Sequence, residues 1–185
     1  MPKIAVTGLS DALAVFDELA DEIGDKKATS KILIPAARES MKPVLAMAKM
    51  LAPKDTGDLS RTLWIEARRP NKRDQKSKYA DPNDTVIALV TTKPFPKKLR
   101  KEFYSKNESL YAKDKSAYKK AFKEFAESIH FPYDARAIAQ EFGTARNSAH
   151  PYLRPALETN ASAVANSLGA IIGRRVEEFK AKNMK

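Results

Sequence analysis

Histidines are the first residues to consider as catalysts or metal ligands. The chain has two, His130 and His150, and it has no cysteine. Neither histidine stands in an H-E-x-x-H or H-x-x-x-H pattern, and zinc sites normally need histidine or cysteine ligands at such spacings. His150 directly precedes Pro151, which restricts its backbone and is typical of a shaped loop. We therefore predict neither a metal site nor histidine-based catalysis.

Three acidic residues, Asp55, Asp58 and Glu66, could form a carboxylate cluster. Nucleases use such clusters to hold Mg²⁺. Asp55 lies in a turn-forming stretch and Asp58 precedes an expected strand, where acids commonly accept hydrogen bonds from nearby backbone N–H groups. This context favours a local structural role and leaves a Mg²⁺-dependent nuclease as a third alternative. Because no nucleotide-binding glycine motif or G-x-S-x-G nucleophile motif occurs, we predict no cofactor and no enzyme activity.

The positive charge of the chain is concentrated in one segment. Residues 67–123 hold 17 Lys/Arg against 6 Asp/Glu, which accounts for the whole net charge of +11. A local basic excess indicates an acidic partner, either nucleic acid or an acidic protein surface. The alternative is a solvated insertion that self-repulsion keeps soluble. The candidates for contact with DNA or an acidic partner are Lys97, Lys98, Arg100 and Lys101.

Aromatic residues gather in the same region. Nine of the fifteen aromatics lie between Phe95 and Tyr133. Nucleobases could stack on rings interleaved with basic residues. The helical spacing of Tyr118, Phe122 and Phe125 instead favours packing in a core or interface. We interpret residues 93–133 as a basic, aromatic-rich insertion within a single domain that spans residues 1–185.

Apolar periodicity sets the elements that surround these residues. It predicts helices over residues 10–23, 34–51 and 108–129 and from Pro155 onward, with a bend at Pro43. Residues 93–101, "KPFPKKLRK", are too rich in proline and lysine for regular structure. Alternating patterns predict strands over residues 63–67, 85–92 and 138–142. The expected fold class is α+β: a small, mostly antiparallel sheet flanked by helices, with the basic helical insertion between strands.

Small residues form a separate face of the last helix. Ala165, Gly169 and Gly173 are spaced four apart. Each glycine inside a helix costs roughly 1 kcal/mol relative to alanine, so such a row indicates a close approach of another backbone. The approach could lie within the fold or between subunits.

The sequence also indicates where the protein is found. No apolar run approaches the length of a membrane span, so we expect no membrane partner. The first residues lack the apolar core of a signal peptide, and the absence of cysteine suits a reducing compartment. We expect a soluble cytoplasmic product.

Two motifs, taken in order, resemble a known family. The first is "AARESMKPVLAMAKMLAPKDTGDLSRTL", and a predicted strand pair follows it. The second is "EFGTARNSAHPYLRPALE". Together they resemble the tail-completion or neck proteins of long-tailed, siphovirus-type phages, which are also described as head–tail joining or minor tail proteins. The resemblance covers roughly residues 34–92 and 135–179, whereas the insertion and the N-terminal helix depart from the family's compact core.

This resemblance implies a structural role without catalytic residues. Such proteins form rings, typically hexamers, at the head–tail interface between the tail terminator and the head connector. The chain would then reside in the virion neck after assembly in the host cytoplasm. An alternative is a DNA-binding accessory protein that acts through the basic insertion.

The second motif would form a joint in such a subunit. We expect Phe142 to close a strand, Gly143 to permit a turn and residues 144–151 to form an exposed loop before the helix. Arginine is favoured at subunit interfaces. The candidates for contact with a subunit or another partner are Arg146, Tyr152, Arg154, Gly169 and Gly173.

Overall fold

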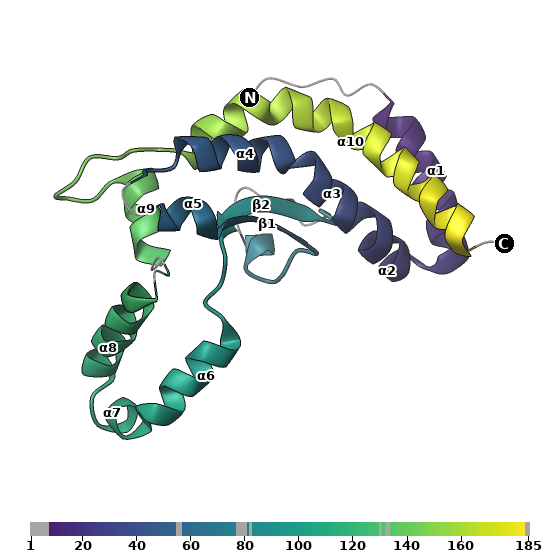
Figure 1. Cartoon of the computed structure of the whole chain (residues 1–185). Helices are drawn as coiled ribbons and strands as arrows, with labels where there is room; N and C mark the ends of the chain where they lie inside the picture. The colour runs from purple at the N-terminus through teal and green to yellow at the C-terminus, as the bar shows by residue number, and fades with distance from the viewer. Residues whose placement is uncertain are drawn as a thin grey trace. The chain divides into compact units, whose positions relative to one another are not determined.

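The computed structural model shows a mostly helical protein with one small sheet (Figure 1). It describes residues 8–54, 57–76, 81, 83–129, 131 and 134–183. The structure is 71% helical, and its two-stranded antiparallel sheet is flanked by helices, which confirms the α+β fold class. The chain forms two compact units. The first contains Met1–Met47, Ile65–Val90 and Pro155–Lys185, and the second contains Ala48–Trp64 and Thr91–Arg154.

The first unit begins with the expected amphipathic helix, α1 (Leu9–Ile23). A second helical stretch starts earlier than predicted, because α2 (Asp25–Ala28) and a π-helical turn η1 (Thr29–Leu33) precede α3 (Ile34–Ser40). Pro35 gives a physical reason for the π turn. Proline lacks an N–H and its ring crowds the carbonyl one turn back, and widening that turn relieves the conflict.

The expected bend near Pro43 is confirmed as an interruption. Helix α3 ends at Ser40, and α4 (Lys42–Leu51) starts after Met41. The carbonyl of Met41 accepts a hydrogen bond from the N–H of Leu45 at 3.1 Å, so the chain returns to helical pairing at once.

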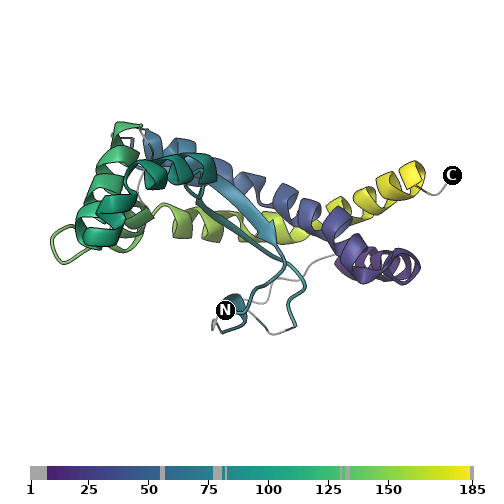
Figure 2. The same cartoon turned by 90° about the horizontal axis from the view of Figure 1, so that it is seen from below.

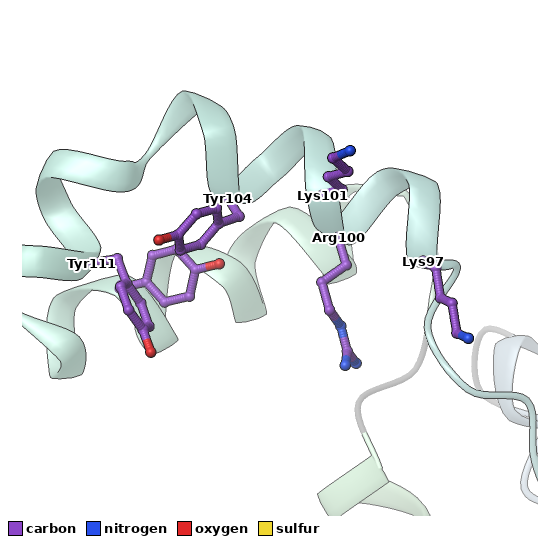
Figure 3. A pocket seen from close by; sticks show the side chains of 6 residues that line it. Lys97, Arg100, Lys101, Tyr104 and Tyr111 are labelled. Atoms are coloured by element: carbon purple, nitrogen blue, oxygen red, sulfur yellow. The ribbon is translucent and has the colours of Figure 1, made fainter.

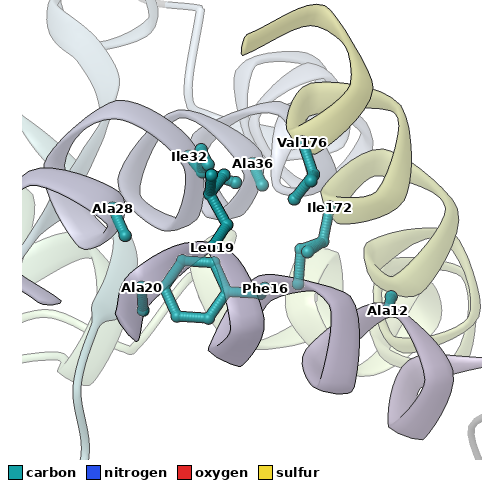
Figure 4. Close-up of a cluster of buried hydrophobic side chains, with 9 residues drawn as sticks. All are labelled: Ala12, Phe16, Leu19, Ala20, Ala28, Ile32, Ala36, Ile172 and Val176. Atoms are coloured by element: carbon teal, nitrogen blue, oxygen red, sulfur yellow. The ribbon is translucent and has the colours of Figure 1, made fainter. Parts of the chain in front are cut away.

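The core of the first unit lies between α1, the α2–α3 stretch and α10 (Leu153–Asn183). Figure 4 shows Phe16 and Leu19 of α1 beside Ile172 and Val176 of α10, with Ile32 at the same cluster. Fully burying a side chain of this size contributes about 1.5–3 kcal/mol. The cluster therefore holds the long C-terminal helix to the N-terminal one.

A polar contact also joins α3 to α10. The Glu39 carboxylate pairs with the guanidinium groups of Arg174 and Arg175, the latter at 2.6 Å. Hydrogen bonds from both arginines hold the pKa of Glu39 below its usual value.

The sheet consists of β1 (Leu63–Arg68) and β2 (Ile87–Thr92), which lie side by side (Figures 1 and 2). Along β1, buried Leu63, Ile65 and Ala67 alternate with half-buried residues, as the sequence pattern predicts. Just beyond β2, the N–H of Lys93 donates to the carbonyl of Thr62 at 2.8 Å. Two short helices flank β1, α5 (Asp58–Thr62) before it and the 3₁₀ turn η2 (Asp74–Lys76) after it.

The insertion is more helical than expected. Helix α6 (Lys97–Lys106) covers most of the stretch predicted to be irregular, and that prediction is wrong. The prolines stand before the first turn of α6, where they remove no hydrogen bond of the helix, and lysine is a good helix former. The helix predicted over 108–129 is divided into α7 (Glu108–Lys113) and α8 (Lys115–Ser128). Asp114 caps α8 by accepting hydrogen bonds from the N–H groups of Ser116 and Ala117 at 2.8 and 3.0 Å.

The strand predicted over residues 138–142 is also wrong, because this segment belongs to helix α9 (Asp134–Phe142). The alanines of α9 occupy alternate positions, 135, 137 and 139, which mimics a strand pattern. Alanine is, however, the strongest helix former. Ile138 and Phe142 stand four apart, which suits a helix. Gly143 ends α9 with a φ of 74°, and its N–H donates to the carbonyl of Ala139 at 2.8 Å. None of the described helices combines the length and apolar character needed to cross a bilayer.

Candidate functional site: the joint between Glu141 and Arg154

The stretch from Glu141 to Arg154, here called the joint, is organised by one buried carboxylate. Glu141 Oε2 accepts hydrogen bonds from the backbone N–H groups of Tyr152 and Leu153, both at 2.9 Å. Its Oε1 accepts from the N–H of Arg154 at 3.1 Å. Glu141 is only 5% exposed. A charged side chain buried to this extent needs such partners to offset its lost hydration.

These three donors are those that the start of α10 leaves open. The first N–H groups of a helix have no partner within the helix, and its N-terminus carries partial positive charge. Helix α10 begins at Leu153, and Pro155, its third residue, has no N–H to satisfy. Glu141 therefore caps α10 from the end of the preceding helix, and α10 starts two residues before the predicted position.

Tyr152 is a buried residue of the joint. Its side chain is 1% exposed. Burial, together with the charge of Glu141, raises the pKa of the Tyr152 hydroxyl to about 12. Of the interface candidates, Tyr152 is thus a core residue of its own chain.

Hydrogen bonds close the loop between the two helices. The N–H of Thr144 donates to the carbonyl of Asn147 at 2.8 Å, and Thr144 Oγ1 accepts from the N–H of Asn147 at 3.0 Å. The N–H of His150 donates to the carbonyl of Gln140 at 2.7 Å. Gly143 is required here, since a Cβ would lie 2.9 Å from the backbone nitrogen of Ala149. The expected loop with a glycine turn is present, although a helix precedes it.

The other interface candidates occupy different surroundings. Arg146 and Arg154 are exposed at the joint. Gly169 and Gly173 belong to the first unit. A Cβ at Gly169 would lie 3.0 Å from the carbonyl oxygen of Gly8, so the close backbone approach at this glycine occurs within the chain. A Cβ at Gly173 would meet no atom within 4 Å.

A polar pocket of about 480 Å³ adjoins the loop. It is lined by Ala139, Gln140, Arg146, Asn147, Ser148 and His150. This lining contains hydrogen-bond donors and one guanidinium but no carboxylate that could orient His150 as a base. The other histidine, His130, lies outside the described residues.

The acidic residues considered for Mg²⁺ are not brought together where the structure describes them. Asp55 lies outside the described residues, Asp58 is in the first turn of α5 rather than directly before the strand, and Glu66 pairs with Arg68 at 2.7 Å. Within the described part of the chain, no group of three or more His, Cys, Asp or Glu side chains is placed to hold a metal ion.

The basic candidates lie on α6. Lys97, Lys98, Arg100 and Lys101 are all exposed. Three of them line a second pocket, together with Tyr104, Tyr111 and Tyr118, and Lys98 does not.

No match to this chain was found among known protein families, curated proteins or solved structures. Two features of the joint were missed by sequence reasoning, namely the role of Glu141 as a cap and the exposure of α9. A glutamate in the E-F-G-T element, followed by a helix with proline at its third position, is the signal that could have revealed the cap.

Proposed function

We propose that this protein is a structural subunit of the phage neck, forming a ring at the head–tail interface that completes the tail and joins it to the head. One observation supports this most directly. The two halves of the second motif, "EFGT" and "HPYLRPALE", are bonded to each other through Glu141, so the motif acts as one structural element. These contacts fix the end of α9 to the start of α10.

The exposed face of α9 supports an assembling role. Ile138 is 59% exposed and Phe142 is 67% exposed, and their spacing of four places both on one side of the helix. Large apolar side chains grouped at the surface mark interaction sites more often than isolated ones do. Arg146 and Arg154 are exposed at the same joint, and arginine is enriched at protein interfaces. We propose that this face contacts the neighbouring copy in a homo-oligomeric ring, hexameric as in the family that the sequence resembles.

The proposed location follows from the same resemblance. The ring would lie in the virion neck between the tail terminator and the head connector, after assembly in the host cytoplasm. Its function would require adhesive faces and a rigid loop. The hydrogen bonds of Thr144 and His150 supply the rigid loop.

Native mass spectrometry of the purified protein and electron microscopy of neck complexes test this proposal. We expect a ring-sized oligomer and labelling of the protein at the necks of purified virions. The double variant Ile138→Ser/Phe142→Ser should stay folded but lose the oligomer. The matched control Leu13→Ser changes an exposed apolar residue of α1 and should keep it. A strictly monomeric wild-type protein that is absent from virions would overturn the proposal.

A further inference from the structure

The aromatic residues of the insertion form two groups that meet at Phe103, whose ring centroid lies 5.5 Å from that of Tyr118. Buried Phe95 and three half-buried phenylalanines form a packed cluster, where the ring centroids of Phe95 and Phe122 are 4.8 Å apart and those of Phe103 and Phe125 are 5.0 Å apart. Aromatic pairs at such distances contribute about 0.5–1.5 kcal/mol beyond their buried area. The phenylalanines therefore account for the packing of α6 against α8.

Three tyrosines, two of them exposed and Tyr118 half-buried, form a second group. Tyr104, Tyr111 and Tyr118 meet edge to face, with centroid distances of 5.2, 5.0 and 6.4 Å. Tyr104 and Tyr111 are each 38% exposed. Figure 3 shows these two rings together, with Arg100 and Lys97 on the neighbouring turns of α6. Tyr104 and Tyr111 thus present ring surface to solvent beside positive charge.

The pocket formed by this group is open and cationic. Its volume is about 330 Å³, and none of its six lining residues, Lys97, Arg100, Lys101, Tyr104, Tyr111 and Tyr118, is acidic. The Arg100 guanidinium lies 5.9 Å from the centroid of the Phe122 ring, which holds it beside the aromatic cluster. Lys115 Nζ lies 5.7 Å from the centroid of Tyr111 and adds a cation at the edge of the group.

We propose that this tyrosine–lysine pocket binds an unpaired strand of nucleic acid, with bases stacked on the tyrosines and phosphates on Lys97, Arg100 and Lys101. The positive charge of the pocket favours a polyanion, and the exposed aromatic rings favour a ligand with planar groups that can stack on them. An acidic peptide would use the cations but not the rings. A duplex keeps its bases stacked away from side chains on its surface. A cationic ligand for an aromatic cage would be repelled by three neighbouring positive groups.

The first experiment compares ligands on the wild-type protein by fluorescence anisotropy. The probes are labelled strands of about twelve nucleotides, oligo-dT and oligo-rU, a duplex of equal length, and a poly-glutamate peptide of equal charge. We expect either strand to bind at least about tenfold more tightly than the duplex or the peptide. The two strands distinguish DNA from RNA as the source of the ligand. Equal binding of the peptide would assign the pocket to an acidic protein, and equal binding of the duplex would reduce it to phosphate attraction; either result overturns the proposal.

The second experiment removes charge inside and outside the pocket. Lys97→Gln/Lys101→Gln should weaken strand binding about tenfold and reduce the slope of log K against log salt by about 1.4. Lys119→Gln/Lys120→Gln removes the same charge from exposed positions of α8 that do not line the pocket. The control should change affinity less than about threefold. Equal losses in both variants would show diffuse attraction and contradict a site.

The third experiment tests stacking. Tyr104→Leu/Tyr111→Leu should weaken strand binding at least about tenfold, whereas Tyr104→Phe/Tyr111→Phe keeps the rings and should retain it. Circular dichroism verifies that helicity is preserved. If the double leucine variant loses helicity, Tyr111→Leu alone provides the comparison. Unchanged binding in a folded leucine variant would overturn the proposal. None of these results depends on ring assembly, so they are separable from the test of the neck proposal.

Discussion

The Glu141 carboxylate accepts a hydrogen bond from the backbone N–H of Tyr152 at 2.9 Å, although Glu141 stands eleven residues earlier in the chain. The bond satisfies a donor at the start of α10 and places a negative charge beside the buried Tyr152 ring. Because the same carboxylate also accepts from Leu153 and Arg154, one side chain holds the end of the loop to α9.

We expect Glu141→Ala to lower the free energy of unfolding by about 2–3 kcal/mol, because it leaves three backbone donors without their charged acceptor. Urea denaturation followed by circular dichroism measures this loss. Glu158→Ala, at an exposed position of α10, is the matched control and should change stability by less than about 1 kcal/mol. Equal effects of the two variants would contradict the capping role.

Gly143→Ala should destabilise the joint by about 1–3 kcal/mol. The glycine has a φ of 74°, and a Cβ there would lie 2.9 Å from the Ala149 nitrogen and 3.1 Å from the Asn147 oxygen. Thermal unfolding measures the change. Gly24→Ala is a useful comparison, since its φ is 87° but a Cβ there would meet no atom within 4 Å. The difference in stability between the two variants isolates the steric contribution. Equal destabilisation of both would show that the loop can move away from the added methyl group.

The sequence is informative where burial is periodic. Leu63, Ile65 and Ala67 alternate because one face of β1 is buried, and that pattern reveals the strand. It misleads in α9, where alternating alanines have no strong preference for either face and the apolar spacing of Ile138 and Phe142 is the better guide.

The joint was only partly predictable for a different reason. The turn at Gly143 and the helix after it follow from local residue types. The cap does not, because Glu141 reaches donors eleven to thirteen residues away and no local rule links them. The tyrosine pocket likewise depends on rings from α6, α7 and α8 that meet only after folding.

Two glycines of α10 should respond oppositely to the same change. Gly173→Ala should raise the free energy of unfolding by about 0.5–1 kcal/mol, because the added methyl meets no atom within 4 Å and alanine favours the helix. Gly169→Ala should lower it, since overpacking against Gly8 and Leu9 costs about 1–3 kcal/mol. Calorimetry of both variants measures the pair. Stabilisation by Gly169→Ala would show that α1 does not press against α10 there.

The ion pairs of Glu39 should make the free energy of unfolding depend on pH in the acidic range. Hydrogen bonds from Arg174 and Arg175 hold the pKa of Glu39 below its ordinary value in the folded protein. The unfolded chain therefore takes up the proton first as pH falls. The contribution of Glu39 to stability is complete above the unfolded glutamate pKa of about 4.3 and is lost as pH falls through the lower folded value.

Glu39→Gln should consequently lower stability at neutral pH, and its difference from the wild type should shrink as pH falls toward about 3. Urea denaturation at a series of pH values measures this convergence. Glu18→Gln, at an exposed position of α1, serves as the control for a simple change of net charge. Added salt should reduce the difference at neutral pH, because Arg174 is largely exposed and its pairing is screened. A difference between Glu39→Gln and the wild type that stays constant with pH would show that the pairs with Arg174 and Arg175 do not stabilise the contact between α3 and α10.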